Sequence, residues 1–267
     1  MTIAEVRALL RSADPDPETV AALAADPRKG VRDLVAAYMR RMERENAEIA
    51  RVEAMYRYES ELYRKGIRHI AGIDEVGRGP LAGPVTVAAV ILPPHWFAEG
   101  LNDSKKVTPK HREVLAEKIH REAEAVSIVS LPPEEIDALN IYEATLMAMY
   151  EAVKRLSVQP EAVIVDAMPL HFTMPTVSLI HGDARSASVA AASIAAKVHR
   201  DHLMDEYDRQ YPEYGFAKNK GYGTADHIAA IERYGITPIH RKSFDPVRSM
   251  LEDGRAHFYI GKEKEAE

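Results

Sequence analysis

Two adjacent carboxylates, Asp74 and Glu75, end an apolar segment and lead into a glycine-rich turn that contains Gly77, Arg78 and Gly79. Acidic side chains are rarely buried without a partner, and a metal ion is the commonest partner that can hold several of them together. The two glycines let the backbone come close to a ligand, while Arg78 presents a fixed cation. These residue types therefore suit a site for a metal ion and a phosphate.

Two further acids follow short apolar runs. Asp166 ends the run 163–165, and Asp183 follows Gly182 after the run 177–180. Strand ends are where sheet proteins place ligands, although Asp166 alone could start a turn and Asp183 alone could cap a helix. Carboxylates without histidine or cysteine suit Mg²⁺ or Mn²⁺. Four carboxylates around two ions is the arrangement for phosphodiester hydrolysis, in which one ion activates water and the other stabilises the leaving oxygen.

Strand geometry limits how Asp74 and Glu75 can act together. Side chains alternate between the faces of a regular strand, so both acids reach one site only if the strand ends or bulges there. Gly77 makes a local break plausible. We therefore predict that Glu75 reaches over the strand edge.

Composition limits the class of protein. The 267 residues fit one large domain or one domain with an appendage. The absence of cysteine excludes disulfides and thiolate zinc sites. No apolar run approaches the roughly 20 residues of a membrane span, and the first residues lack the order of a signal peptide, so we expect a soluble cytoplasmic protein with no membrane partner. The net charge of -6 argues against a basic coat for nucleic acid but allows a local basic groove.

Residues 1–66 are predicted to be entirely helical. Two short segments, broken at residues 14–17 and 26–27, precede one long helix from Val31 to Lys65. Apolar residues recur along it at three- and four-residue steps, but Glu45 and Glu59 occupy two of the expected apolar places. Such a helix could dock on the next domain or on itself, or it could be an arm that grips substrate or a partner.

The remainder alternates strands with helices, which predicts an α/β fold with a mixed sheet and helices on its faces. Expected strands are His69 to Glu75, Val85 to Leu92, Ala125 to Leu131, Ala162 to Asp166 and Val177 to Ile180, the first two being an antiparallel pair. Expected helices are Pro109 to Glu122, Pro133 to Leu156, Ser186 to Arg209 and Ala225 to Tyr234. We expect three regions: a helical extension (1–66), a catalytic domain that includes a C-terminal helical segment (67–248) and a frayed tail (249–267).

Several separated blocks make the chain resemble the bacterial type 2 ribonucleases H, the ribonuclease HII family, across roughly residues 68–248. The matching blocks are Gly72 to Pro84, Asn102 to Lys106, the strand end at Asp166, Gly182-Asp183, Ala191 to Val198 and Asn219 to Thr224. The region before residue 66 resembles an extension carried by some members. The resemblance implies a ribonuclease H-like mixed sheet flanked by helices.

The resemblance also implies roles for individual residues. Asp74, Glu75, Asp166 and Asp183 would be the catalytic carboxylates that hold two Mg²⁺ or Mn²⁺ ions. Gly77, Arg78 and Gly79 would recognise the 2′-hydroxyl that distinguishes RNA from DNA. Tyr222 would stack on the sugar of the next nucleotide. Asn102, Ser104 and Lys105 would contact phosphates, with Ser193 and Lys197 supporting the substrate site.

The function implied is that of an endoribonuclease, and we expect a monomer. Such an enzyme would hydrolyse the RNA strand of RNA/DNA hybrids and cut on the 5′ side of ribonucleotides embedded in duplex DNA, as ribonucleotide excision requires. Its partners would be those two nucleic acids.

The residues by themselves leave other interpretations open. The glycines could serve only a tight hairpin, the cluster at 102–105 could be a solvated turn, and Tyr222 could be a lid on the core. An aromatic ring among lysines and glycines also suits stacking on nucleic acid. Ser193 and Lys197 share a helix face and could be structural. Histidines 171, 181, 199 and 202 form no convincing ligand set.

Three other functions compete with this one. A nucleotide-binding module that uses the glycines as a phosphate loop is disfavoured, because a strand and not a helix follows them. A non-catalytic nucleic-acid binder would be hindered by four carboxylates facing phosphates. Another metal nuclease with a ribonuclease H-like core would lack the turn that reads the 2′-hydroxyl.

Overall fold

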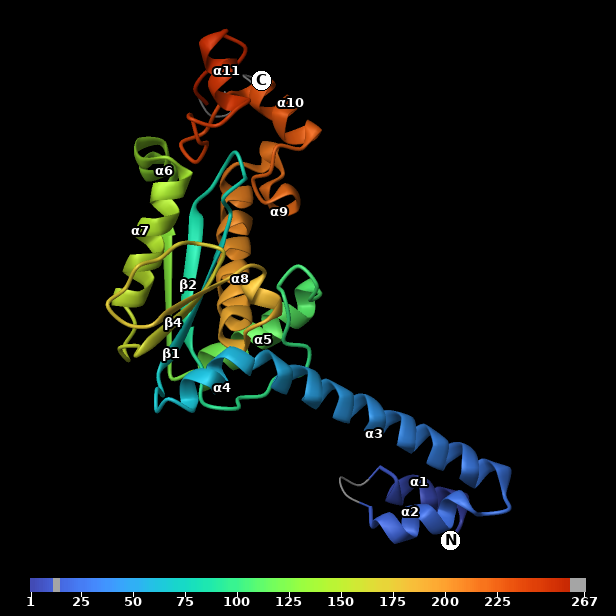
Figure 1. The fold of residues 1–267 in the computed structure, drawn as a ribbon. Coiled ribbons are helices and arrows are strands. Elements are labelled where there is room, and N and C mark those ends of the chain that lie inside the picture. Colours follow the sequence, from blue (N-terminus) through green and yellow to red (C-terminus); the bar gives the residue numbers. More distant parts are fainter. Residues whose placement is uncertain (12–14, 260–267) are drawn as a thin grey trace, which may run out of the picture. The chain divides into compact units, whose positions relative to one another are not determined.

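The computed structural model describes residues 1–11 and 15–259 and separates into two compact units, Met1–Glu53 and Ala54–Glu267. Figure 1 traces their helices and strands along the chain. The expected helix break at residues 14–17 begins at Asp14, which lies outside the described residues. No helix in the described ranges is long and apolar enough to cross a bilayer.

The first unit is helical, as predicted. It contains α1 (Ile3–Leu9), α2 (Pro17–Ala24) and most of α3 (Lys29–Met55). Thr2 and Asp16 cap the two short helices with their side-chain oxygens. The three helices pack through one apolar cluster, formed by Val6, Leu10, Val20, Leu23, Val31 and Val35.

The prediction of one unbroken helix from Val31 to Lys65 is wrong. Helix α3 ends at Met55, and α4 (Arg57–Tyr63) begins after a non-helical Tyr56. The Tyr56 ring is buried, and its hydroxyl donates to the carbonyl oxygen of Trp96 at 2.8 Å. This contact is 40 residues away in sequence, so helical periodicity alone does not reveal it.

The second unit is built on a five-stranded mixed sheet of order β3-β2-β1-β4-β5. Its strands are β1 (Ile70–Val76), β2 (Val85–Ile91), β3 (Ala125–Leu131), β4 (Ala162–Asp166) and β5 (Thr176–Leu179). The pairs β1/β2 and β2/β3 are antiparallel, whereas β1/β4 and β4/β5 are parallel. The predicted mixed sheet and its first antiparallel pair are therefore confirmed.

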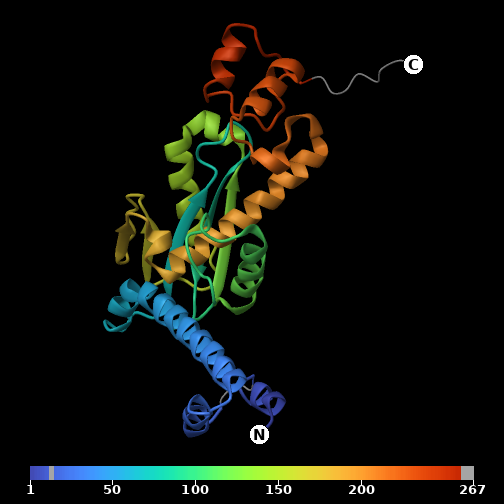
Figure 2. The ribbon, with the colours of Figure 1, turned by 90° about the vertical axis from the view of Figure 1, so that its right-hand side faces the viewer.

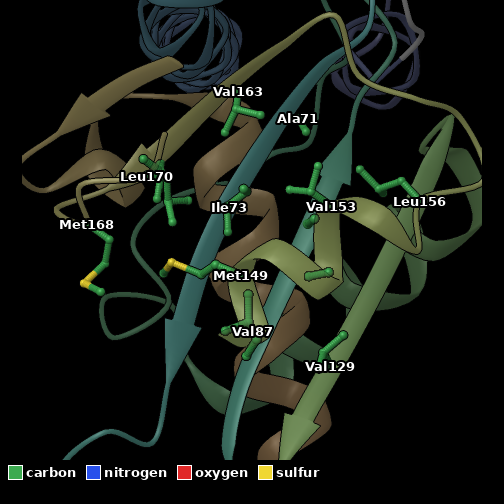
Figure 3. Close-up of a cluster of buried hydrophobic side chains, with 14 of the residues drawn as sticks. Ala71, Ile73, Val87, Val129, Met149, Val153, Leu156, Val163, Met168 and Leu170 are labelled. Carbon is green, nitrogen blue, oxygen red and sulfur yellow. The ribbon is translucent and has the colours of Figure 1, made fainter. Parts of the chain in front are cut away.

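Helices cover both faces of the sheet (Figures 1 and 2). On one face α8 (Ala187–Gln210) packs against β1 and β2, and α5 (Pro109–Glu122) packs against α8. Gly72 permits this approach, because a Cβ there would lie 2.1 Å from the carbonyl carbon of Ser188. On the other face α7 (Ile141–Lys154) covers β1 to β3, and its Met149 joins the apolar cluster shown in Figure 3.

The single helix predicted from Pro133 to Leu156 is two helices. Helix α6 (Pro133–Leu139) stops at Asn140, which has a positive φ of 72°, and α7 follows directly. The Asn140 side chain accepts hydrogen bonds from the N–H groups of Tyr142 and Glu143. Asparagine tolerates positive φ and caps helices well, so one residue ends α6 and begins α7.

The C-terminal part forms a second apolar core. Its short helices are η2 (Pro212–Tyr214), α9 (Phe216–Asn219), α10 (Ala225–Tyr234) and α11 (Val247–Glu252). The frayed tail expected beyond residue 248 is wrong for residues 249–259, because Met250 and Ala256 are buried and Tyr259 donates its N–H to Ile236. Residues 260–267 of that prediction lie outside the described residues.

Candidate active site

Asp74 and Glu75 lie on β1 where the sheet opens on one side. The pairing with β2 continues to Val76, whereas the pairing with β4 ends at Ile73. The strand neither ends nor bulges at the two acids, so the expected break there is wrong. By strand alternation Asp74 faces α8, where it is hydrogen-bonded to Ser193, and Glu75 faces away. Both residues nevertheless lie beyond Ile73, the last residue of β1 that pairs with β4. Each side chain therefore lies next to the open edge of β1 at that point.

The side chain of Asp166 contacts the backbone immediately before Asp183. Asp166 is the last residue of β4, and its Oδ1 accepts the N–H of Gly182 at 2.7 Å. Gly182 begins the 3₁₀ turn η1 (Gly182–Ala184), which contains the largely buried Asp183. The turn runs into α8, whose N-cap is Ser186. The end of one strand and the start of one helix thus hold these two acids together.

Electrostatics also connect the four acids. Burial, followed by the charge of Glu75, raises the pKa of Asp74, and Asp166 adds to the effect. Burial raises the pKa of Glu75 against the opposing charge of Arg78. The pKa of Asp183 is raised by burial and then by the charges of Asp103 and Asp166. Negative charge is therefore concentrated here without enough cation to balance it.

A divalent cation would fit this environment. All four side chains offer oxygen ligands, and Glu75 Oε2 is buried with no hydrogen-bond partner among the described residues. As the side chains stand, no group of three or more histidines, aspartates or glutamates in residues 1–11 and 15–259 is arranged to hold a metal ion. The fit is therefore one of charge and donor type.

The glycine turn connects the acids to Tyr222. Arg78 Nη1 lies 3.5 Å from Glu75 Oε1 and 3.8 Å from the sulfur of Met168. A Cβ on Gly79 would lie 3.7 Å from the Tyr222 ring. Tyr222 keeps 49% of its surface exposed. The turn and the exposed ring thus border one surface beside the carboxylates.

Two buried arginines bind carbonyl groups of this turn and of the residues that flank it. Arg200 donates to the carbonyl oxygens of Pro84, Ala82 and Lys220. Arg241 donates to the carbonyl oxygens of residues 77, 78 and 83. Burial lowers the pKa of Arg200 to about 10, and burial together with the charge of Arg200 lowers the pKa of Arg241 to about 9. Both guanidinium groups remain charged at neutral pH and fix the turn through backbone atoms.

The cluster at residues 102–105 lies next to the carboxylates. Ser193 Oγ donates to Ser104 Oγ at 2.9 Å, and the charge of Lys105 partly offsets the raised pKa of Asp183. Asn102 Oδ1 accepts the N–H of Asp103. The structure therefore brings Ser104, Lys105 and Ser193 beside the acids.

Lys197 is the exception among the expected site residues. Its ammonium group forms an ion pair with Asp201 at 2.6 Å, one helical turn further along α8. Both side chains are mostly buried in this pair. Its ion pair is therefore made within α8 itself.

Several residues near the site are absent from the sequence-based prediction. Asp103 stands inside the predicted block at residues 102–105, where its acidic type is the available indication. Arg241 and Glu59 carry no local pattern that separates them from surface charges. Glu59 occupies an expected apolar place in the helix pattern, and only 1% of it is exposed.

Glu59 anchors the start of α8 beside Asp183. Its Oε1 accepts hydrogen bonds from the hydroxyls of Ser186 and Ser188, both at 2.6 Å, and from the N–H of Ser188 at 3.1 Å. A carboxylate at a helix N-terminus is favoured by the helix dipole and by unpaired N–H groups. Helix α4 therefore supports the segment that contains Asp183.

Replacing Glu59 with alanine should destabilise the protein by about 2–4 kcal/mol, because three buried donors lose a charged acceptor. Urea unfolding measures the change. Glu61→Ala is the matched control on the same helix, since Glu61 is exposed and should change stability little. Equal stability for the two variants would contradict the anchoring role.

Replacing Gly77 with alanine tests how tightly the turn is held. Gly77 has φ +87°, and an added Cβ would lie 2.2 Å from Arg200 Nε. Gly66 has nearly the same φ, +85°, but open space around the added atom. Gly66→Ala should therefore lose about 1 kcal/mol from backbone strain alone. Gly77→Ala should lose at least about 2 kcal/mol more, from overpacking, and equal losses in urea unfolding would show that the turn yields.

Known proteins match the chain along most of its length. The family model described as Ribonuclease HII matches residues 71–247, and that described as Ribonuclease HII N-terminal domain matches residues 2–63. A protein named Ribonuclease HII from Desulfitobacterium hafniense (strain DSM 10664 / DCB-2) is 50% identical over 253 residues, covering 94% of this chain and 97% of that protein. One of the same name from Geobacillus kaustophilus (strain HTA426) is 52% identical over 250 residues, covering 94% and 96%.

A solved structure has the same fold. The ribonuclease H2 from Pyrococcus horikoshii OT3 superposes with a TM-score of 0.62 at 25% identity, covering 70% of this chain and 99% of that one. The predicted ribonuclease H-like architecture is thereby confirmed. With the family models and the close relatives, the match leads to one conclusion: the chain belongs to the ribonuclease HII family of hydrolytic endoribonucleases.

Proposed function

We propose that this endoribonuclease hydrolyses the RNA strand of RNA/DNA hybrids and cuts on the 5′ side of ribonucleotides embedded in duplex DNA. One observation supports this most strongly: the turn at residues 77–79 is held between the carboxylates and an exposed tyrosine. The residues that would recognise the sugar then lie beside the carboxylates that would bind the metal ions for phosphate hydrolysis. The 2′-hydroxyl is the feature that such a reader can use to tell RNA from DNA.

Asp74, Glu75, Asp166 and Asp183 would hold two Mg²⁺ or Mn²⁺ ions. The unbalanced negative charge and the unpartnered Glu75 Oε2 favour hard divalent cations. When bound, the ions would activate the attacking water and stabilise the leaving oxygen. Burial of Asp74 and Asp183 keeps these ligands from being hydrated individually. Their attachment to β1 and to the start of α8 fixes them to rigid elements.

The neighbouring residues would position the nucleic acid. Backbone groups of Gly77 and Gly79, with the Arg78 side chain, would contact the 2′-hydroxyl and the adjoining phosphate. Tyr222 would stack on the next sugar. Asn102, Ser104 and Lys105 would contact phosphates on the other side of the acids. Ser193 would support Ser104 and Asp74, whereas Lys197, paired with Asp201, would act through α8.

Three further assignments accompany this function. We propose that residues 1–66 are an accessory extension and that residues 67–248 carry the catalysis. We propose a monomer, because the four acids and the residues that border them come from one chain. A place in the cytoplasm follows from substrates that occur with chromosomal DNA.

The deciding experiment compares a DNA duplex containing one ribonucleotide with an all-DNA duplex, in Mg²⁺, in Mn²⁺ and in chelator. Metal-dependent cutting only on the 5′ side of the ribonucleotide is expected. Cutting of the all-DNA duplex would support a metal-dependent nuclease but contradict recognition of the 2′-hydroxyl. No cutting with either ion would favour a protein that only binds nucleic acid.

Tyr222→Ala should weaken cutting at a ribonucleotide followed by DNA more than cutting of a uniform hybrid. The expected loss is up to about 150-fold, taking as the upper bound the roughly 3 kcal/mol that an aromatic ring can contribute by stacking on a base. Tyr222→Phe retains the ring and should retain the preference. Steady-state kcat/KM on both substrates measures the ratio, and equal losses on both would contradict stacking at this position.

A further inference from the structure

Two buried histidines lie directly beneath the Tyr222 backbone. His227 is in the first turn of α10, and His240 follows that helix in the segment that leads to Arg241. Their Nε2 atoms are 3.0 Å apart, and their exposed fractions are 0% and 1%. Nδ1 of His227 lies 2.9 Å from the carbonyl oxygen of Tyr222. The two rings thus form a chain that ends on the residue proposed to stack on the sugar.

The protons in this chain can be assigned from its ends. The backbone N–H of Thr237 donates to His240 Nδ1 at 2.9 Å, so that nitrogen carries no proton. His240 must then carry its proton on Nε2 and donate it to His227 Nε2. His227 in turn carries its proton on Nδ1 and donates it to the Tyr222 carbonyl oxygen. Only one pair of neutral tautomers satisfies every contact.

The surroundings keep both rings neutral. The phenylalanine ring of Phe216 packs edge-on against His227 at 5.3 Å, and Tyr214 lies 5.2 Å from His240. Burial lowers the pKa of His227, and burial lowers the pKa of His240 to about 3. Neutral rings are what the chain requires, because a doubly protonated ring could not accept.

The hydrogen-bonded histidines are also connected to the glycine turn. His240 pairs its backbone with Ala82, and the neighbouring Gly83 N–H donates to the carbonyl of Ile239 at 2.8 Å. Gly221, on the other side, accepts the N–H of Leu81 at 2.8 Å. Tyr222 and the turn at residues 77–83 are therefore fastened to one C-terminal strand-like segment. The spacing between the ring and the turn depends on this connection.

We propose that His227 and His240 are positioning residues, which hold the Tyr222 backbone at a fixed place relative to the glycine turn and so set selectivity for a ribonucleotide followed by DNA. The selectivity part rests on the proposed function. Neither histidine contacts the substrate. They act by fixing a residue whose ring remains free to stack.

Two substitutions at position 227 separate positioning from packing. Asparagine places its amide nitrogen where His227 Nδ1 stands and retains donation to Tyr222, but it loses the contact with His240. Glutamine places its terminal group where Nε2 stands and retains the contact with His240, but it loses donation to Tyr222. Both leave a similar space in the same core, so both should lose comparable stability in urea.

The measurement is kcat/KM for a duplex with one ribonucleotide divided by kcat/KM for a uniform hybrid. His227→Gln should lower this ratio about three- to tenfold, the range that one neutral hydrogen bond supports. His227→Asn should remain within about twofold of the wild-type ratio, in the same range of interaction energies. Equal ratios for the two variants, lowered or unchanged, would overturn the proposal.

A second measurement is independent of activity. Nitrogen-15 chemical shifts of selectively labelled histidine in the whole protein report the tautomers, which should be Nδ1–H for His227 and Nε2–H for His240. The opposite tautomer at His227 would overturn the positioning role whatever the enzyme cuts. The tautomers could be as assigned while Tyr222→Ala leaves the wild-type ratio unchanged. That result would contradict the proposed stacking by Tyr222 but not the hydrogen bonds from His240 through His227 to its carbonyl oxygen.

Discussion

Asp74→Asn is expected to reduce cleavage by about 10³-fold or more, because it removes a charged group from the proposed metal site. Binding of an RNA/DNA hybrid should remain close to that of the unchanged protein, since the residues proposed to contact phosphates are untouched. Single-turnover cleavage and a filter or anisotropy binding assay measure the two effects separately. Asp226→Asn, at an exposed position on α10, is the matched control and should leave both unchanged.

The same variant should be more stable than the unchanged protein in the absence of metal. Asp74 is buried and lies near the charges of Glu75 and Asp166, so neutralising it removes both a desolvation cost and a repulsion. We expect a gain of about 1–2 kcal/mol, which is within the range of single stabilising substitutions. Thermal unfolding in chelator measures it.

Activity that survives Asp74→Asn would remove Asp74 from the proposed metal site. Loss of activity together with loss of stability would have a different meaning. It would indicate that Asp74 serves the fold through Ser193, to which it is hydrogen-bonded. The two readouts therefore distinguish a catalytic carboxylate from a structural one.

Arg241→Met is expected to cause the largest loss of stability of any substitution proposed for this chain. The side chain is fully buried and donates to the carbonyl oxygens of Gly77, Arg78 and Gly83. Methionine fills much of the volume but leaves three buried acceptors without donors, each at about 1–3 kcal/mol. The expected total is about 3–5 kcal/mol, because partial relaxation lets some carbonyls find water.

Urea unfolding of Arg241→Met, Arg241→Lys and Arg209→Met tests this expectation. Lysine retains the charge but not the planar fork, so it should recover only part of the loss. Arg209 is exposed near the end of α8 and serves as the control for replacing arginine by methionine. A stability close to wild type for Arg241→Met would mean that the turn is held without the guanidinium.

Local sequence patterns predicted the main elements well where one residue type determines the local structure. The predicted bounds of α5 and α10 agree with the structure, where Thr108 caps α5 ahead of Pro109, and Thr224 and Gly235 stand at the two ends of α10. Caps and prolines act within one helical turn, so a local pattern is enough to place them. The strands could be recognised from their apolar and β-branched runs. Asn140 was missed as a boundary because a good helix pattern continues on both sides of it.

The residue types also indicate which chemistry is available: carboxylates at strand ends beside a glycine turn, with no cysteine. Which residues surround those carboxylates depends on the folding of distant segments onto one another. The tertiary structure brought Asp103 to Asp183, Glu59 to the start of α8, and Arg241 to the carbonyl groups of the turn. These contacts span tens to more than a hundred positions, and those of Arg241 are made to backbone acceptors. A backbone carbonyl has the same chemistry at every residue, so no sequence pattern marks the one that an arginine will bind.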